Sequence, residues 1–151
     1  MCIGLARAGC HVAACDLNEG PLAETIEMCK NVAPASSQFY SAIVDVGDEE
    51  ACLGFAADVA SAFKSEHINL LFNNAGFGGP AGFFDDRKAF DAIIRVNWFG
   101  VYAMARAFRD ALVASKGSGG DGEAITGAII NTSSISGFHV RSLSTHQNAV
   151  C

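Results

Sequence analysis

The chain has 151 residues, of which 50% are apolar and 17% are charged, and its formal net charge is -6 at pH 7. This composition is typical of one globular domain with a sizeable core and excludes a disordered tail. The acidic balance argues against nucleic acid or an anionic membrane as a partner, because the average surface would repel both. The sequence has no apolar run of about 18 residues and no signal-like start, so we expect no membrane span and a cytoplasmic protein.

The chain contains six cysteines, and their spacing indicates neither a disulfide framework nor a metal site. No CxxC pair and no cysteine-histidine cluster with metal-ligand spacing occurs. In a chain without an export signal, cysteines are mostly small, reduced core residues. We therefore expect no bound metal.

The first segments predict a helix end, a strand and a second helix. Residues 3–8 have helical spacing and are followed by Gly9, a residue suited to closing a helix. Residues 11–16 form a strand-like apolar run. Asn18 is in a position to cap the next helix, whose apolar face is expected to contain Leu22, Ile26 and Cys29.

The middle of the chain repeats this alternation of strand and helix. Residues 39–44 predict a second strand, and the acids at 48–50 are expected to open a helix that ends near Ser65. The expected apolar stripe of that helix comprises Cys52, Phe55, Ala56, Val59 and Phe63. Residues 68–72 are nearly all apolar, which is typical of a strand covered on both faces.

The last third predicts one long helix and a fourth strand. The glycine-rich residues 73–82 require a sharp turn, and a helix is expected over about 88–115. Its apolar stripe comprises Phe90, Ile94, Val101, Met104, Phe108 and Leu112, with Asn97 on the same stripe. A flexible loop is expected at 116–127, a strand at 128–131 and an irregular tail at 138–151.

Strand-length apolar runs that alternate with helical segments are typical of crossover units around a parallel sheet. The sequence therefore predicts an α/β fold with a Rossmann-like, doubly wound parallel sheet. Ligands of such sheets bind beyond the carboxyl ends of the strands. Polar residues that follow the strands are therefore the candidate site residues.

Two acids follow the first two predicted strands. Asp16 could accept both hydroxyls of an adenosine ribose, and its charge would repel a 2′-phosphate, which favours NAD over NADP. A turn-forming or capping Asp is the alternative. Asp45 and Val46 repeat the arrangement one strand later, where the acid could meet an adenine amino group and Val46 could pack on the ring.

Amide side chains follow the third strand and interrupt the long helix. Residues 73–76, Asn-Asn-Ala-Gly, combine two amides with small residues that allow the backbone to approach a flat ligand closely. An Asx turn is the alternative there. Asn97 would cost a few kcal/mol on an apolar stripe unless partners are supplied, so we expect it to fix backbone or to order a water molecule. A satisfied amide with no catalytic duty is the alternative.

These motifs together resemble one enzyme family. Asn-Asn-Ala-Gly at 73–76, the asparagine within 95–100, and Ile-Ile-Asn-Thr-Ser-Ser at 129–134 followed by Gly137 have the order and rough spacing of short-chain dehydrogenases/reductases. With the two strand-end acids, the resemblance extends over nearly the whole chain up to Gly137. It implies a partial NAD(P)-binding Rossmann domain over 1–151, with NAD expected in preference to NADP.

The resemblance also implies roles for individual residues. Asp16 would contact the adenosine ribose, and Asp45 and Val46 would contact adenine. Hydride would pass between nicotinamide and the carbon of a small-molecule alcohol or ketone. Ser134, in preference to Ser133, would bind the substrate oxygen, and Asn97 would hold a water molecule in a proton relay. The residues implied along the path to the nicotinamide ribose are Asn73, Ala75 and Gly76.

The sequence departs from the family at both ends. The family opens with a strand and a glycine-rich phosphate turn, and no counterpart precedes residue 11. Similar enzymes carry a Tyr-x-x-x-Lys pair after the catalytic serine, and no Tyr or Lys follows Ser134. We therefore expect an incomplete sheet without its first strand and C-terminal part, and a poorly stable or self-associating chain without turnover.

Three interpretations of function follow. The first is an oxidoreductase of the short-chain dehydrogenase/reductase type in an incomplete form. The second is a non-catalytic Rossmann-like module for binding or dimerisation, because the helix at 88–115 resembles the one with which such enzymes form homo-oligomers. The third is an unrelated flavodoxin-like binding domain.

Overall fold

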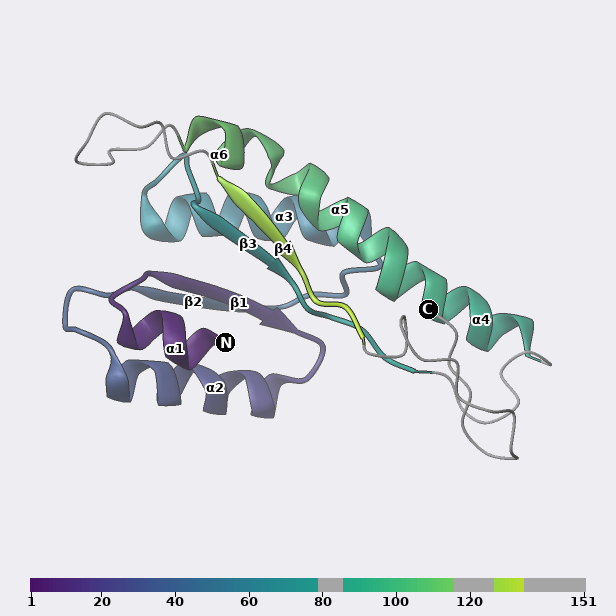
Figure 1. Ribbon diagram of the computed structural model, residues 1–151, viewed down its shortest axis with the longest axis horizontal. Helices are drawn as coiled ribbons and strands as arrows, with labels where there is room; N and C mark the ends of the chain where they lie inside the picture. Colours follow the sequence, from purple (N-terminus) through teal and green to yellow (C-terminus); the bar gives the residue numbers. More distant parts are fainter. Residues whose placement is uncertain (79–85, 116–126, 135–151) are drawn as a thin grey trace.

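The computed structural model of the chain describes residues 1–78, 86–115 and 127–134. Within these ranges it contains strands and helices in alternation, arranged in two short parallel sheets (Figure 1). None of the helices in these ranges has the length and apolar content of a bilayer-spanning segment. The predicted loop at 116–127, apart from Gly127, and the predicted tail at 138–151 lie outside the described residues.

The first sheet pairs β1 (Val12–Asp16) with β2 (Phe39–Ile43), and the two strands run parallel. Helices α1 (Cys2–Arg7) and α2 (Glu19–Val32) cover one face of this sheet around a small cluster centred on Ala6, Val12 and Cys29. The end of α1 follows the prediction. Gly9 has a φ of +87°, and the N–H groups of Gly9 and Cys10 close the helix on Ala6 and Leu5, as in a Schellman motif.

Helix α2 buries Leu22, Ile26 and Cys29, the three residues expected on its apolar face. Its N-terminus differs from the expectation. Asn18 occupies the N-cap position but makes no side-chain capping bond, because its amide donates to Asp16 instead.

Helix α3 (Glu49–Phe63) covers the other face of the first sheet. The Asp48 carboxylate accepts the N–H groups of Glu50 and Ala51, which caps the helix, and Lys64 ends it with a φ of 49°. The buried residues of α3 are Cys52, Phe55 and Val59, in agreement with the predicted stripe, whereas Ala56 and Phe63 are half-buried.

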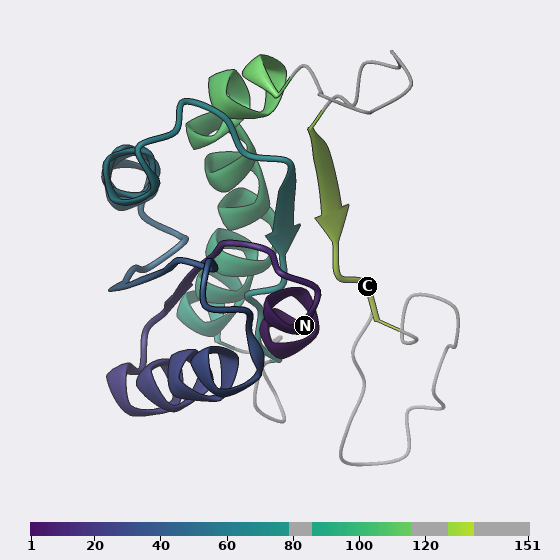
Figure 2. The ribbon, with the colours of Figure 1, turned by 90° about the vertical axis from the view of Figure 1, so that its left-hand side faces the viewer.

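The second sheet pairs β3 (Leu70–Asn73) with β4 (Ala128–Asn131), also in parallel. Helices α5 (Gly100–Ala107) and α6 (Arg109–Ala114) lie on one side of this pair (Figure 2). The expectation of a third strand covered on both faces is wrong for its first residue. Leu70 is 43% exposed, and Ile129 and Ile130 of β4 are exposed as well.

The predicted long helix is interrupted. It consists of α4 (Arg87–Ile94), a π-helical turn η2 (Arg95–Phe99), α5 and α6, and the Gly100 N–H donates to the Arg95 carbonyl five residues back. The additional residue in the turn changes which side chains face the core. The second half of the predicted stripe is buried at Met104, Phe108 and Leu112, whereas Phe90 and Ile94 are exposed and Val96 takes the inward position.

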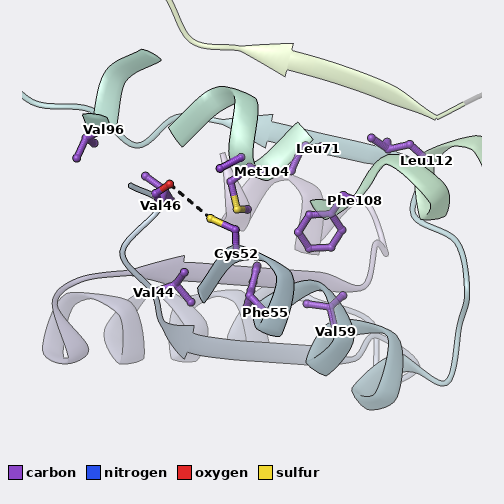
Figure 3. Close-up of a cluster of buried hydrophobic side chains, with 11 residues drawn as sticks. Val44, Val46, Cys52, Phe55, Val59, Leu71, Val96, Met104, Phe108 and Leu112 are labelled. Carbon is purple, nitrogen blue, oxygen red and sulfur yellow. Dashed lines mark hydrogen bonds between the residues drawn. The ribbon is translucent and has the colours of Figure 1, made fainter. Parts of the chain in front are cut away.

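One apolar cluster joins the two sheets. It contains Val44 and Val46 after β2, three residues of α3, Leu71 of β3 and residues of α5 and α6 (Figure 3). Ala13 and Cys15 of β1 pack against the same cluster. Helices α1 and α2 on one face and α3 and α5 on the other give the doubly wound arrangement that the sequence predicts.

The two sheets are not hydrogen-bonded to each other within the described residues. The ladder of the first sheet begins with the Val12 N–H bonded to Gln38 and ends with the Asp16 carbonyl bonded to Val44. Alternate residues of a strand direct their main-chain groups to opposite edges. The N–H and C=O groups of Ala13 and Cys15 therefore lie on the edge of β1 that faces away from β2.

The second sheet has a matching free edge. Asn69 and Asn73 accept N–H groups from Ala128 and Thr132, so the intervening Leu70 and Phe72 direct their main-chain groups away from β4. No backbone partner for these groups occurs among the described ranges. In the part of the chain that the structure describes, the sheet is therefore incomplete, as the sequence predicts.

We expect the free edges to produce an alternating pattern of amide hydrogen exchange. The N–H groups of Ala13, Cys15 and Phe72 should exchange rapidly, whereas those of Ala14 and Leu71, which face their paired strands, should be protected. Exchange measured residue by residue with NMR would check this pattern. Equal protection of Ala13 and Ala14 would show that the edge of β1 is paired.

Candidate functional site

The candidate site residues lie where strands end. The strands of both sheets run in the same direction, so the segments after their carboxyl ends are on one side of the molecule (Figures 1 and 3). Asp16 ends β1, Asp45 follows β2, Asn73 ends β3 and Ser134 follows β4. This is the edge at which ligands of an open parallel sheet bind.

Asp16 is exposed and forms an Asx turn. Its Oδ1 accepts the Asn18 N–H at 2.9 Å and the Asn18 side-chain amide at 3.2 Å. These bonds hold the carboxylate at the strand end and use one of its two oxygens. The turn that was the alternative to ribose binding is therefore present, and within residues 1–78, 86–115 and 127–134 no hydrogen bond to Oδ2 occurs.

Asp45 is held by two donors. Arg95 Nη1 donates to Oδ2 at 2.7 Å, and the Gly47 N–H donates to Oδ1 at 2.8 Å. The hydrogen bond from Arg95 is the main cause that lowers the pKa of the Asp45 carboxyl, partial burial opposes it, and the Gly47 N–H adds to the lowering. Asp45 is consequently an anion with a fixed orientation at neutral pH.

The residues after Asp45 pack closely against the helix that carries Arg95. Val46 is buried, its carbonyl accepts the Cys52 thiol at 3.4 Å (Figure 3), and a Cβ on Gly100 would lie 2.8 Å from its Cγ2. Only glycine at position 100 permits this approach. Val46 thus belongs to the core, and the structure shows its side chain packed against protein.

The ends of β3 and β4 are joined by side chains. Asn73 is buried and donates to Asn131 Oδ1 at 2.9 Å, and the Thr132 hydroxyl donates to Asn74 Oδ1 at 3.0 Å. The two strands are in register at Asn73 and Asn131. The Asn-Asn pair therefore aligns the loop after β3 with the segment that leads to the serines, and Ala75 and Gly76 are exposed beyond it.

Asn97 holds a backbone segment in place, as the sequence predicts, but its side chain is exposed and does not lie on a buried stripe. Its Nδ2 donates to the Phe77 carbonyl at 2.9 Å and its Oδ1 accepts the Phe77 N–H at 3.0 Å. A Cβ on Gly76 would lie 3.3 Å from Asn97 Oδ1, so the small residue permits the contact. The placement on a buried stripe is wrong, because Asn97 is exposed, as are Phe90 and Ile94 of the same predicted stripe.

Ser133 and Ser134 are exposed beyond the end of β4. Thr132, two residues before Ser134, bonds to Asn74, and Phe77 in the same loop bonds to Asn97. The loop of residues 74–77 therefore has Asn97 on one flank and the serine segment on the other.

Sequence reasoning missed three residues that organise the site: Arg95, Asn131 and Thr132. The sequence contained a signal for Asn131, because Asn131 is an amide at the end of a strand, as Asn73 is. Arg95 carried no signal, because its partner Asp45 lies 50 positions away. Sequence spacing does not show which of the exposed charges of a helix meets a loop carboxylate.

The carboxylates of Asp16 and Asp45 at the strand ends are hydrogen-bond acceptors. Two carboxylates, of which one is held by a cation, offer acceptors for hydroxyl and amino groups. No group of three or more metal-ligating side chains occurs among the described residues. Burial raises the pKa of the Cys15 and Cys52 thiols to about 11, so both are protonated at neutral pH and do not act as thiolates.

Comparison with known proteins identifies the arrangement. A family model described as short chain dehydrogenase matches residues 1–146. A short-chain type dehydrogenase/reductase from Mycobacterium marinum superposes with a TM-score of 0.79 at 21% identity, covering 98% of this chain and 54% of that one. No individual curated protein matches the chain in sequence.

Two further similar structures contain bound ligands. A xylitol dehydrogenase bound to NAD⁺ has a TM-score of 0.73 and 25% identity over 91% of this chain and 51% of its own. A 7α-hydroxysteroid dehydrogenase in complex with NADH and 7-oxo glycochenodeoxycholic acid has a TM-score of 0.75 and 20% identity over 91% and 49%. The chain thus spans about half the length of the solved structures it matches.

We expect the contribution of Asp45 to stability to depend on pH. Its pKa is lowered in the folded state, so the contribution is present above the unfolded pKa, about 3.9, and is lost as the pH falls through the folded pKa. Asp45→Asn should reduce the free energy of unfolding at pH 7 by no more than about 1 kcal/mol, because the pair is partly exposed. Urea unfolding from pH 7 to pH 3 should show the two proteins converging in stability, and a constant difference would contradict the pairing.

Proposed function

We propose that this chain, which belongs to the short-chain dehydrogenase family of oxidoreductases, binds NAD in a site for hydride transfer between nicotinamide and an alcohol or ketone carbon. When bound, the nicotinamide supplies or accepts the hydride. The chain's residues bind and orient the dinucleotide and the substrate oxygen. The proposed substrate is a small-molecule alcohol or carbonyl compound.

The observation that carries the proposal is the row of polar residues at the strand ends. Asp16 and Asp45 lie at the ends of neighbouring strands of one sheet, as acceptors for a ribose and an adenine would. The loop of residues 74–77 follows β3 and is held by Asn97. The xylitol dehydrogenase, which is bound to NAD⁺, supports a nicotinamide dinucleotide as the ligand.

Asp16 is the basis for proposing NAD in preference to NADP. A carboxylate that accepts hydrogen bonds from the ribose hydroxyls would lie close to the 2′-phosphate of NADP. The negative charges of the carboxylate and the phosphate would repel each other. Asp16 has one oxygen engaged in the turn, and the other has no protein donor in the part of the chain that the structure describes. Ala75 and Gly76, which are exposed, complete the proposed cofactor contacts, and we propose that the buried Val46 and Asn73 support the loops that make these contacts.

Ser134 and Asn97 are the proposed catalytic residues. Ser134 would donate a hydrogen bond to the substrate oxygen, and Asn97, anchored on Phe77, would support a water molecule in a proton relay. Residues 135–151 contain neither Tyr nor Lys. Without a general acid/base of that kind, we propose that this chain binds dinucleotide weakly and does not turn over substrate.

Dinucleotide binding tests this proposal directly. NADH fluorescence should show saturable binding to the chain, with a lower affinity for NADPH. Asp16→Ser should weaken NADH binding about tenfold, through loss of hydrogen bonds to a charged acceptor. The same substitution should leave NADPH binding unchanged or stronger, because the repulsion of the 2′-phosphate is removed.

The matched control is Asp110→Asn, which removes an exposed carboxylate on α6, away from the strand ends. It should change neither affinity. If wild-type protein shows no saturable NADH binding, or if Asp16→Ser weakens NADH and NADPH binding equally, the proposed site is incorrect.

A second candidate function is self-association through the segment 88–115. Phe90, Ile94, Trp98 and Tyr102 are spaced four residues apart and are exposed, with Trp98 at 75%. An exposed apolar row of this kind is typical of an interaction surface. We propose that this row packs against the same row of a second copy.

Trp98→Glu should therefore reduce self-association. A charge at the centre of an apolar contact should shift the monomer-dimer equilibrium at least about tenfold towards monomer. Sedimentation velocity over a range of protein concentrations would measure the shift. Met28→Glu, at an exposed position of α2, is the matched control and should have no effect. Equal behaviour of the two variants would exclude this row as the interface.

A further inference from the structure

One helical turn contacts the ligand-side loops of both sheets. Arg95 bonds to Asp45, which follows β2, and two residues later Asn97 bonds twice to Phe77, which follows β3. The two sheets share no main-chain pairing within the described residues. The side chains of the π-helical turn η2 therefore link two loops that belong to different sheets.

Arg95 lies across the loop that carries Asp45. A Cβ on Gly47 would lie 2.9 Å from Arg95 Cγ, so the absence of a side chain at position 47 makes room for the arginine stem. Gly47 also donates its N–H to the second oxygen of Asp45. Arg95 and Gly47 thus hold the carboxylate from two directions, which restricts it to one orientation.

A second ion pair in the same region provides a comparison. Arg106 of α5 pairs with Glu49 at the start of α3, and the exposures of the two arginines and of their two partners are similar. Glu49 is a helix residue, however, whereas Asp45 follows a strand on the ligand side. The two pairs therefore have similar chemistry and differ in location.

We propose that Arg95 is a positioning residue for the adenine end of the cofactor, acting through Asp45. Its guanidinium sets the direction of the Asp45 carboxylate, and the turn that carries it holds the adenine-side loop at a fixed separation from the loop of residues 74–77. The inference rests on the proposed function, because it assigns Asp45 to adenine. It predicts that loss of Arg95 weakens recognition of adenosine and leaves recognition of nicotinamide unchanged.

The test compares ligands with and without adenosine. Arg95→Met should weaken binding of NADH and of ADP-ribose about fivefold, less than the loss of a direct hydrogen bond to a charged group, because Arg95 acts only through Asp45. Binding of reduced nicotinamide mononucleotide, which has no adenosine, should stay unchanged. Arg95→Lys should recover part of the loss because it keeps the charge, and Arg106→Met, the matched control, should bind all three ligands as wild type does.

A double substitution shows whether Arg95 acts through Asp45. In an Asp45→Asn background, Arg95→Met should have no further effect on ADP-ribose binding. An equal loss in both backgrounds would overturn the proposal. An equal loss for the ligand without adenosine would overturn it too, because it would indicate a general structural effect.

A measurement without ligand separates this inference from the proposed function. Absence of NADH binding by the wild-type chain would overturn the proposed function and with it the assignment of Arg95 to adenine. The effect of Arg95 on the loop that carries Asp45 would then be tested by amide exchange. Arg95→Met should accelerate exchange of the Gly47 N–H about fivefold and leave that of Phe77 unchanged, whereas an unchanged Gly47 would overturn the positioning role as well.

Discussion

Main-chain pairing in this chain stops between β1 and β3, and the rest of the structure depends on how that interruption is bridged. Ala13 and Cys15 on one side and Leu70 and Phe72 on the other direct their backbone groups towards edges without a backbone partner in the described residues. Hydrogen bonds hold each sheet together internally. Side chains of α3, α5 and α6, packed in one apolar cluster, hold the sheets to each other.

The polar links at the strand ends compensate for part of this interruption. Arg95 and Asn97 join the loops of the two sheets through a single turn, whereas the bond between Asn73 and Asn131 acts within the second sheet. A π-helical turn is a frequent feature of functional sites, since it moves a side chain to a position that a regular helix does not offer. Here the turn carries Asn97, which hydrogen-bonds to Phe77, and Val96, which is buried in the core.

In the proposed function, recognition of the dinucleotide and proton transfer depend on different residues. The described residues contain the strand ends on which the proposed NAD contacts depend, and these contacts use carboxylates, amides and small residues. Proton transfer requires a group of suitable pKa near the substrate oxygen. The family supplies this group as a Tyr-Lys pair after the serine, and residues 135–151 have neither. The family assignment and the proposed absence of turnover are therefore compatible.

The elements that follow from local patterns were predictable. The apolar spacing of Leu22, Ile26 and Cys29 predicted the buried face of α2, and Gly9 predicted the end of α1. The alternation of strands and helices predicted a doubly wound parallel sheet, which the structure and the related folds confirm. The strand-end positions of Asp16, Asp45 and Asn73 were predictable as well, because strand ends depend on nearby residues.

The sequence by itself determined the order and approximate extent of the strands and helices, since capping, periodicity and turn chemistry act over a few positions, but not the π-helical turn that interrupts the segment 88–115. Only the tertiary structure decided that Arg95 holds Asp45, that Asn97 faces outward to Phe77, and that the edges of β1 and β3 stay apart. Each of these depends on contacts between distant segments, and the pair Arg95 and Asp45 is separated by 50 positions. Such contacts form only when packing brings the segments together, and local sequence patterns do not encode them.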